Sequence, residues 1–304
     1  MIRTVDQSHG SPFDDPRSAP SPVVDVSIRI RSADGVEADL ALTRPRGATA
    51  GLFWLPALGV AARHYAGLAE ALAARGIALA RHEWRGHGSS SVRASRRCDW
   101  SYRELLESDI PAALDAVSRA APDLRWSIGG HSLGAQLATL TWLRRPSDLH
   151  GLAVVAGGVP WWRHFDGAQA LAFRAVLATL PLVTAAVGYF PGRRLGFGGR
   201  EARGVMRDWA ASAMTGRYAH AGDRVSPAAT ARPVLGIGFA RDGLIPRSAL
   251  DDLLARTGSA ASTVVVLDAR DLAGVTPDHF SWMRRPEPLA HRLSTWLHTA
   301  SESA

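Results

Sequence analysis

The sequence contains no lysine and only one cysteine. All 35 of its basic residues are arginines, and they give the chain a formal net charge of +7. The single cysteine, Cys98, excludes an internal disulfide bond and is typical of a reducing compartment. It lies in an arginine-rich stretch without a second cysteine nearby, so it does not indicate a metal site.

Long runs of one charge and long apolar runs are also scarce. The arginines occur singly or in pairs, and they form no stripe that would favour binding to nucleic acid. The longest apolar stretch, residues 175–190, is short for a membrane span and contains Pro181. We therefore expect no transmembrane span, although this stretch could touch a membrane surface. The polar start of the chain lacks the apolar core of a signal peptide, which predicts a disordered tail over residues 1–22 and a cytoplasmic protein.

The order of strand-like and helix-like segments along the chain predicts one α/β domain with an insertion, for which 304 residues are sufficient. Alternating apolar residues favour a β-hairpin over residues 23–42. Short buried strands then alternate with helices, first up to residue 158 and again over 224–304. This alternation predicts a mostly parallel sheet with helices on both faces, built from residues 23–158 and 224–304.

Residues 159–223 interrupt this alternation, since they are helical in pattern and rich in aromatic side chains. We expect them to form a helical lid. Trp161, Trp162 and Phe165 follow a strand directly, so they either hang over the mouth of a pocket or pack the lid onto the core. The first alternative predicts a small-molecule substrate with an apolar acyl or ring portion. The oligomeric state has no signal in the sequence.

The five residues Gly130-His-Ser-Leu-Gly134 match the Gly-x-Ser-x-Gly pattern of a nucleophile elbow. A short strand precedes them and a helix follows, which is the context that the pattern requires. In such a turn Ser132 stands clear of the sheet, while the two glycines leave room where strand and helix pass closely. The alternative is an ordinary glycine-rich turn with a solvated serine.

A serine hydroxyl needs a general base, and that base needs an orienting carboxylate. In this class of fold the order along the chain is serine, acid, histidine, each after a strand. Asp242 follows a strand predicted to end at residue 239, and His279 lies beyond the last strand. His131 belongs to the elbow itself and is expected to face away. The competing acids, which also lie near the end of the chain, are Asp268, Asp271 and Asp278.

The negative charge of a reacting carbonyl oxygen needs two backbone donors. One is expected to be the N–H of Leu133, directly after Ser132. The other is expected from the loop after the strand that contains Phe53 and Trp54, at Leu58.

These motifs together resemble the α/β-hydrolase superfamily over about residues 23–304, and more narrowly a group of poorly characterised bacterial α/β-fold hydrolases. A serine at the elbow argues against the dehalogenase and epoxide-hydrolase branches. Two positions depart from the usual pattern: Pro56-Ala57 replaces the His-Gly of the oxyanion loop, and Glu83 replaces an aspartate. The segments that carry the resemblance are residues 56–65, Glu83-Trp-Arg-Gly-His-Gly-Ser89, 130–134, Tyr189-Phe-Pro-Gly-Arg-Arg194, Asp208-Trp209 and Asp278-His-Phe280.

The sequence therefore predicts a serine hydrolase that cleaves an ester or thioester through an acyl-enzyme on Ser132, with no metal ion or organic cofactor. An acyltransferase or cyclase that uses the same acyl-enzyme is an alternative, because only the acceptor differs. A ligand-binding protein without catalysis is the third alternative.

Overall fold

The computed structural model describes residues 23–145, 147–219 and 231–302. The tail predicted for residues 1–22 lies outside the described residues, and so do the last four residues of the predicted lid, 220–223. The residues at which the core ends and the lid begins stay a prediction.

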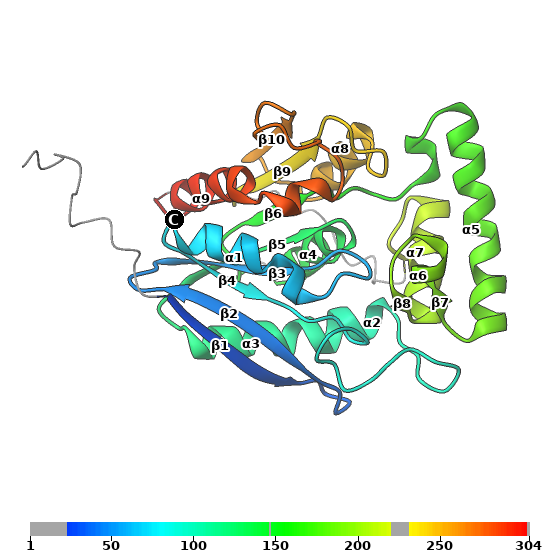
Figure 1. Cartoon of the computed structure of the whole chain (residues 1–304), viewed down its shortest axis with the longest axis horizontal. Helices are drawn as coiled ribbons and strands as arrows, with labels where there is room; N and C mark the ends of the chain where they lie inside the picture. Colours follow the sequence, from blue (N-terminus) through cyan, green and yellow to red (C-terminus); the bar gives the residue numbers. More distant parts are fainter. Residues whose placement is uncertain (1–22, 146, 220–230, 303–304) are drawn as a thin grey trace, which may run out of the picture.

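An eight-stranded sheet forms the centre of the molecule, in the order β1-β2-β4-β3-β5-β6-β9-β10 (Figure 1). The hairpin strands β1 and β2 pair antiparallel, and β2 is also antiparallel to β4. Every other pairing in this sheet is parallel, so the predicted mostly parallel sheet is confirmed. The strands are β1 (Val23–Arg31), β2 (Glu37–Pro45), β3 (Ala50–Leu55), β4 (Ile77–Arg81), β5 (Arg125–His131), β6 (Leu152–Val155), β9 (Val234–Phe239) and β10 (Ser262–Leu267).

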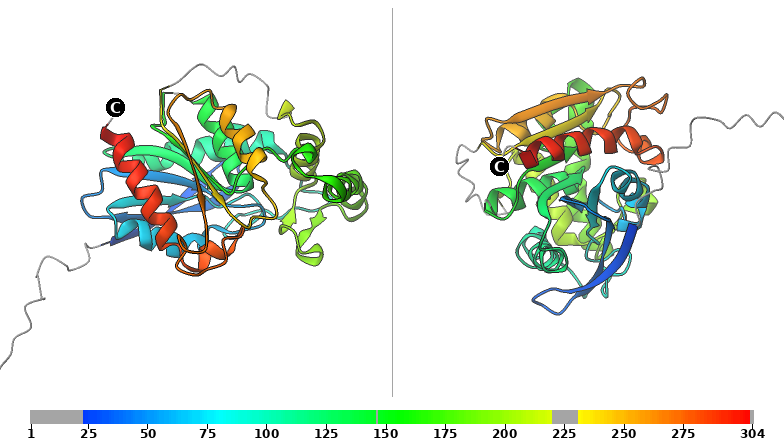
Figure 2. Two further views of the ribbon diagram at one scale, coloured as in Figure 1. Left: turned by 90° about the horizontal axis from the view of Figure 1, so that it is seen from above. Right: turned by 90° about the vertical axis from the view of Figure 1, so that its left-hand side faces the viewer.

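Helices cover both faces of this sheet, as the alternating sequence pattern predicts. On β3, Leu52 and Trp54 pack toward α1 and α9, whereas Phe53 and Leu55 pack toward α3, α4 and α8. All four side chains are fully buried, which is why β3 reads as a continuous apolar run. The left view of Figure 2 shows α1 and α9 on one side of the sheet and α4 and α8 on the other. These helices are α1 (Ala66–Ala73), α3 (Ile110–Ala120), α4 (Leu133–Arg144), α8 (Arg247–Ala255) and α9 (Glu287–Glu302).

The helical segment that follows residue 101 begins with a capping box, but it is not regular. Ser101 and Glu104 form a capping box at its start, each side chain bonded to the backbone of the other. After α2 (Tyr102–Glu104), residues Leu105–Asp109 form a π-helical turn that leads into α3. The wider turn brings Asp109 to the buried side.

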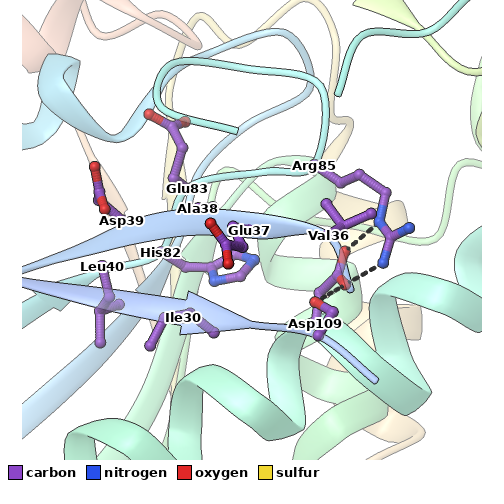
Figure 3. A pocket seen from close by; sticks show the side chains of 11 residues that line it. Ile30, Val36, Glu37, Ala38, Asp39, Leu40, His82, Glu83, Arg85 and Asp109 are labelled. Carbon is purple, nitrogen blue, oxygen red and sulfur yellow. Dashed lines mark hydrogen bonds and ion pairs between the residues drawn. The ribbon is translucent and has the colours of Figure 1, made fainter. Parts of the chain in front are cut away.

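Asp109 binds Arg85 in a buried ion pair, with 2.6 Å between Arg85 Nη2 and Asp109 Oδ1 (Figure 3). Arg85 also binds Asp34 in the turn between β1 and β2, at 3.0 Å. These carboxylates raise the pKa of Arg85 despite the opposing effect of its burial. The ion pairs fix the segment after β4. This segment contacts the loop that follows β3, where Pro56 O accepts from Trp84 Nε1 at 2.9 Å.

The lid elements lie between β6 and β9, beyond one end of the sheet (Figure 1). The longest of them, α5, packs against α7. The lid comprises η3 (Trp162–His164), α5 (Gly167–Val187), β7 (Phe190–Pro191), α6 (Gly192–Leu195), β8 (Arg200–Glu201) and α7 (Arg203–Thr215).

Helix α5 is longer than the apolar run predicted, because it starts at Gly167 and continues through Arg174 and Pro181. It ends at Gly188, which has a left-handed φ of 89°. Among the described residues, α5 is the one helix long and apolar enough to cross a membrane by length and composition. Its side chains Leu171 and Leu182 are 65% and 72% exposed. The absence of a transmembrane span stays a prediction.

Candidate active site

Ser132 stands at the sharp turn between β5 and α4, with φ 57° and ψ −118°. A non-glycine residue rarely adopts this backbone conformation, which is strained. The turn is tight on both sides: a Cβ at Gly130 would lie 2.4 Å from the backbone of Gly134, and a Cβ at Gly134 would lie 2.1 Å from Leu55 O. Only glycine fits at these two positions, as the elbow pattern predicts.

His279 and Asp242 lie side by side at the ends of two different segments. His279 Nδ1 is 2.8 Å from Asp242 Oδ2, and both side chains are buried. The other carboxylate oxygen of Asp242 accepts hydrogen bonds from the N–H groups of Leu244 and Ile245, at 2.9 and 3.0 Å. Because both oxygens are held, the carboxylate has one orientation, and His279 Nδ1–H donates to it. This arrangement directs Nε2 of His279 away from Asp242.

The competing carboxylates serve local turns instead. Asp268 Oδ1 accepts from the backbone N–H groups of Arg270 and Asp271. Asp278 Oδ1 accepts from those of Phe280 and Ser281.

A cavity of about 550 Å³ opens between the sheet and the lid, and both Ser132 and His279 line it. Leu58 and Leu133 line the same cavity. Within the part of the chain that the structure describes, the backbone N–H groups of these two leucines donate no hydrogen bond. Two unpaired N–H groups beside a serine are what an oxyanion hole requires.

A chain of hydrogen bonds links the residues that precede Leu58 and Ser132. The N–H of Ala57 donates to Tyr65 Oη at 2.9 Å, and Tyr65 Oη lies 3.0 Å from His131 Nδ1. On the other side of the ring, His131 Nε2 lies 2.9 Å from the backbone oxygen of His279. Because that oxygen can only accept, His131 carries its proton on Nε2, and the Tyr65 hydroxyl donates to Nδ1.

Electrostatics keep both members of this chain neutral. Burial lowers the pKa of His131 well below its ordinary value, and the nearby His279 lowers it further. Burial likewise raises the pKa of Tyr65, so its hydroxyl stays protonated. His131 thus faces away from the cavity, as predicted, and contacts the backbone of His279.

The base of the lid packs directly on the loop that contains Leu58. A Cβ at Gly59 would lie 2.3 Å from the backbone nitrogen of Gly199. The carboxylate of Glu201 accepts from the N–H of Gly199 at 2.6 Å and lies 3.2 Å from His87 Nε2. Lid and core are therefore joined beside the predicted oxyanion donor by buried polar side chains.

The three predicted lid aromatics have different surroundings. Phe165 lines the cavity and contacts Phe173, with ring centroids 4.9 Å apart. Trp161 and Trp162 are not among the residues that line it. Both rings lie 5.3 Å from the guanidinium of Arg163. The chain turns through η3 between these indoles and Phe165, so the three side chains do not share one direction.

Several residues that line the cavity are not among the predicted substrate-binding residues. On α5 they recur at helical spacing, at Gln169, Ala172, Phe173 and Val176, which is a signal that the sequence contains. The others come from separate segments and have no shared pattern: Gln136, Phe197, Trp209, Leu244, Ile245 and Phe280.

The sheet, the strained serine and the Asp242–His279 pair define this chain as an α/β hydrolase. The family model described as "Serine aminopeptidase, S33" (Hydrolase_4) matches residues 49–210, more than half of the sequence. The chain belongs to this hydrolase family. A search of curated proteins found no match.

Solved structures share the fold at low sequence identity. An esterase from Exiguobacterium antarcticum is 13% identical with a TM-score of 0.62, over 90% of this chain and 100% of that one. A monoacylglycerol lipase from Paleococcus ferrophilus is 15% identical with a TM-score of 0.57, over 91% and 99%. A hydrolase from Pseudomonas aeruginosa is 22% identical with a TM-score of 0.56, over 89% and 98%.

Proposed function

We propose that this protein is a serine hydrolase that cleaves a carboxylic ester or thioester through an acyl-enzyme on Ser132. The observation that carries the proposal is the 2.8 Å contact between Asp242 and His279 beside a cavity that Ser132 also lines. A carboxylate on Nδ1 fixes the tautomer in which Nε2 of His279 is a base. A serine at a strained turn, next to such a base, is an activated nucleophile.

In this mechanism the nucleophile, the base and the oxyanion donors are separate groups. Ser132 Oγ attacks the substrate carbonyl carbon while His279 Nε2 takes its proton. The N–H groups of Leu133 and Leu58 bind the oxygen that becomes negative. The bond to the leaving group then breaks, and His279 returns the proton to the departing alcohol or thiol. Water, deprotonated by His279, attacks the acyl-enzyme and releases the acid and free Ser132.

The lining of the cavity supports a substrate whose acyl portion is uncharged. Apart from Ser132 and His279, the described residues that line it are apolar, glycine or amide side chains, without an acidic or basic group. An aminopeptidase binds a substrate ammonium group, and none of the described residues that line this cavity has a carboxylate to pair with one. The lining therefore favours esters and thioesters over the N-termini of peptides.

A panel of p-nitrophenyl esters and acyl thioesters, tested with the wild type and with Ser132→Ala, measures this activity. We expect turnover by the wild type and at least about 1,000-fold less by the variant, because the nucleophile is removed. Addition of a small alcohol separates hydrolysis from acyl transfer, since a transferase releases the new ester. Equal turnover by the wild type and Ser132→Ala would contradict the proposal.

A further inference from the structure

Gln136 is a buried amide in the wall of the candidate active site. It lies on α4 four residues after Ser132, so about 6 Å of helix separates the two along its axis. The residue is 2% exposed and lines the same cavity as Ser132 and His279. Its Oε1 is buried and makes no hydrogen bond with any described residue.

An amide oxygen without a partner in such a place is unfavourable for folding. A buried polar group without a partner loses its hydration and gains no hydrogen bond in return. Other buried positions on the same helix carry apolar side chains, as Leu133 and Leu137 do, so folding of this helix does not call for a polar residue at position 136. A glutamine at position 136 is better explained by a partner that arrives with the substrate.

The surroundings narrow the chemistry of that partner. Within the described ranges, no arginine lines the cavity to pair with a carboxylate or phosphate, and the walls are mainly apolar. Rotation about the last side-chain bond exchanges Oε1 and Nε2, so one amide can offer the cavity an acceptor or a donor. A hydroxyl group can both donate and accept, and therefore fits either orientation.

We propose that Gln136 is a specificity-determining residue that binds a hydroxyl group on the acyl portion of the substrate. The substrate class is then a hydroxyacyl ester or thioester, in which the hydroxyl lies a few bonds from the reacting carbonyl. This inference rests on the proposed function, because it assigns the substrate of the same site. A site built to bind a hydroxyl discriminates strongly against the analogue that lacks it.

The experiment compares matched thioesters with the same acyl length, one plain and the others with a hydroxyl at the second or third carbon. We expect the wild type to prefer one of the hydroxyacyl substrates by at least about tenfold in kcat/KM. Gln136→Met keeps the length of the side chain and removes the amide. In this variant the preference for the hydroxyacyl substrate over the plain thioester should fall to about twofold or less.

Thr141→Val is the matched control. Thr141 lies on the same helix, is 2% exposed, and has a buried hydroxyl that no described residue binds, but it does not line the cavity. This variant should keep the wild-type preference for the hydroxyacyl substrate. Removal of an unpaired buried polar group should leave Tm unchanged or raise it in both variants.

Three outcomes would overturn the inference. Equal rates with plain and hydroxyacyl thioesters in the wild type would show that no hydroxyl is bound, while the hydrolase itself would stand. A Gln136→Met variant with a lower Tm and equal losses on all substrates would show that the amide is structural. No turnover together with no labelling of Ser132 by a fluorophosphonate would remove the proposed function, and the inference with it.

Discussion

Tyr65 Oη lies 3.0 Å from His131 Nδ1, and this contact joins the loop after β3 to the turn that holds Ser132. Tyr65 also accepts the N–H of Ala57, the residue before the predicted oxyanion donor Leu58. His131 extends the network to the backbone oxygen of His279, which also accepts a hydrogen bond from Trp282 Nε1 at 3.1 Å. The three segments that carry the proposed catalytic groups thus share one buried network.

Tyr65→Phe removes the hydroxyl at the centre of this network. It leaves the N–H of Ala57 without its acceptor, and the position of Leu58 becomes less well defined. We expect kcat to fall about tenfold with little change in KM, because the loss concerns the transition state. Steady-state kinetics measures both values. Tyr102→Phe is the matched control, since the Tyr102 hydroxyl is equally buried but has no partner among the described residues; a similar loss there would refute a specific role for Tyr65.

Asp242→Asn keeps the shape of the side chain but removes the charge that orients His279. In an equivalent triad this change lowers kcat about 10,000-fold, and we expect a loss of at least about 1,000-fold here. Asp268→Asn removes a carboxylate that serves only the turn after β10, so its kinetics should match the wild type. If both variants lost activity equally, Asp242 would not be the orienting acid.

Gly59 and Gly47 form a matched pair for the contact between lid and oxyanion loop. Their φ angles are similar, 78° and 76°. A Cβ at Gly59 would collide with the backbone of Gly198 and Gly199, whereas a Cβ at Gly47 would have no described atom within 4 Å. Gly47→Ala should cost only about 1–2 kcal/mol of backbone strain and keep activity. Gly59→Ala should lower kcat/KM at least about tenfold, because the donor loop must shift. Equal activity of the two variants would contradict the contact.

His82 makes the folded state sensitive to acid. It lies in the wall of the pocket drawn in Figure 3. Its ring is buried against Trp84, and this burial lowers the pKa of His82 from 6.5 to about 4. Between these values the unfolded chain binds a proton that the folded protein does not, so the free energy of unfolding falls as pH falls from about 6.5 to about 4. The loss attributable to His82 is on the order of 3 kcal/mol.

Denaturant unfolding of the wild type and His82→Leu at several pH values between 4 and 7 measures this dependence. The difference between the two curves separates His82 from the other buried histidines of the described chain, His87, His131 and His279. His291→Leu, on the exposed side of α9, is the control for the loss of an imidazole. Curves for His82→Leu that run parallel to those of the wild type would show that His82 does not carry the acid sensitivity.

The fold and the principal site residues were predictable because they follow from local pattern and chain order. The parallel strands could be recognised from buried runs such as residues 50–55. In a parallel sheet their carboxyl ends meet at one edge, so residues far apart in sequence, Ser132, Asp242 and His279, were expected to converge there.

The details of the pocket were not predictable, for identifiable reasons. Trp161, Trp162 and Phe165 are all aromatic and close in sequence, so the sequence does not distinguish them. The turn of η3 decides which of them faces the cavity. Pro181 suggested a break, yet α5 continues through it, because a helix docked on other elements can tolerate one missing N–H. Tyr65 and His131, which bind each other, are 66 residues apart in the sequence, and no local pattern links them.

The measurement that tests the central claim most directly is labelling of the purified protein by a fluorophosphonate, with Ser132→Ala beside it and intact mass as the readout. The account predicts one adduct on the wild type and none on the variant, because only a serine with an assembled base reacts at neutral pH. Failure of the wild type to react with both this probe and a small sulfonyl fluoride would contradict it.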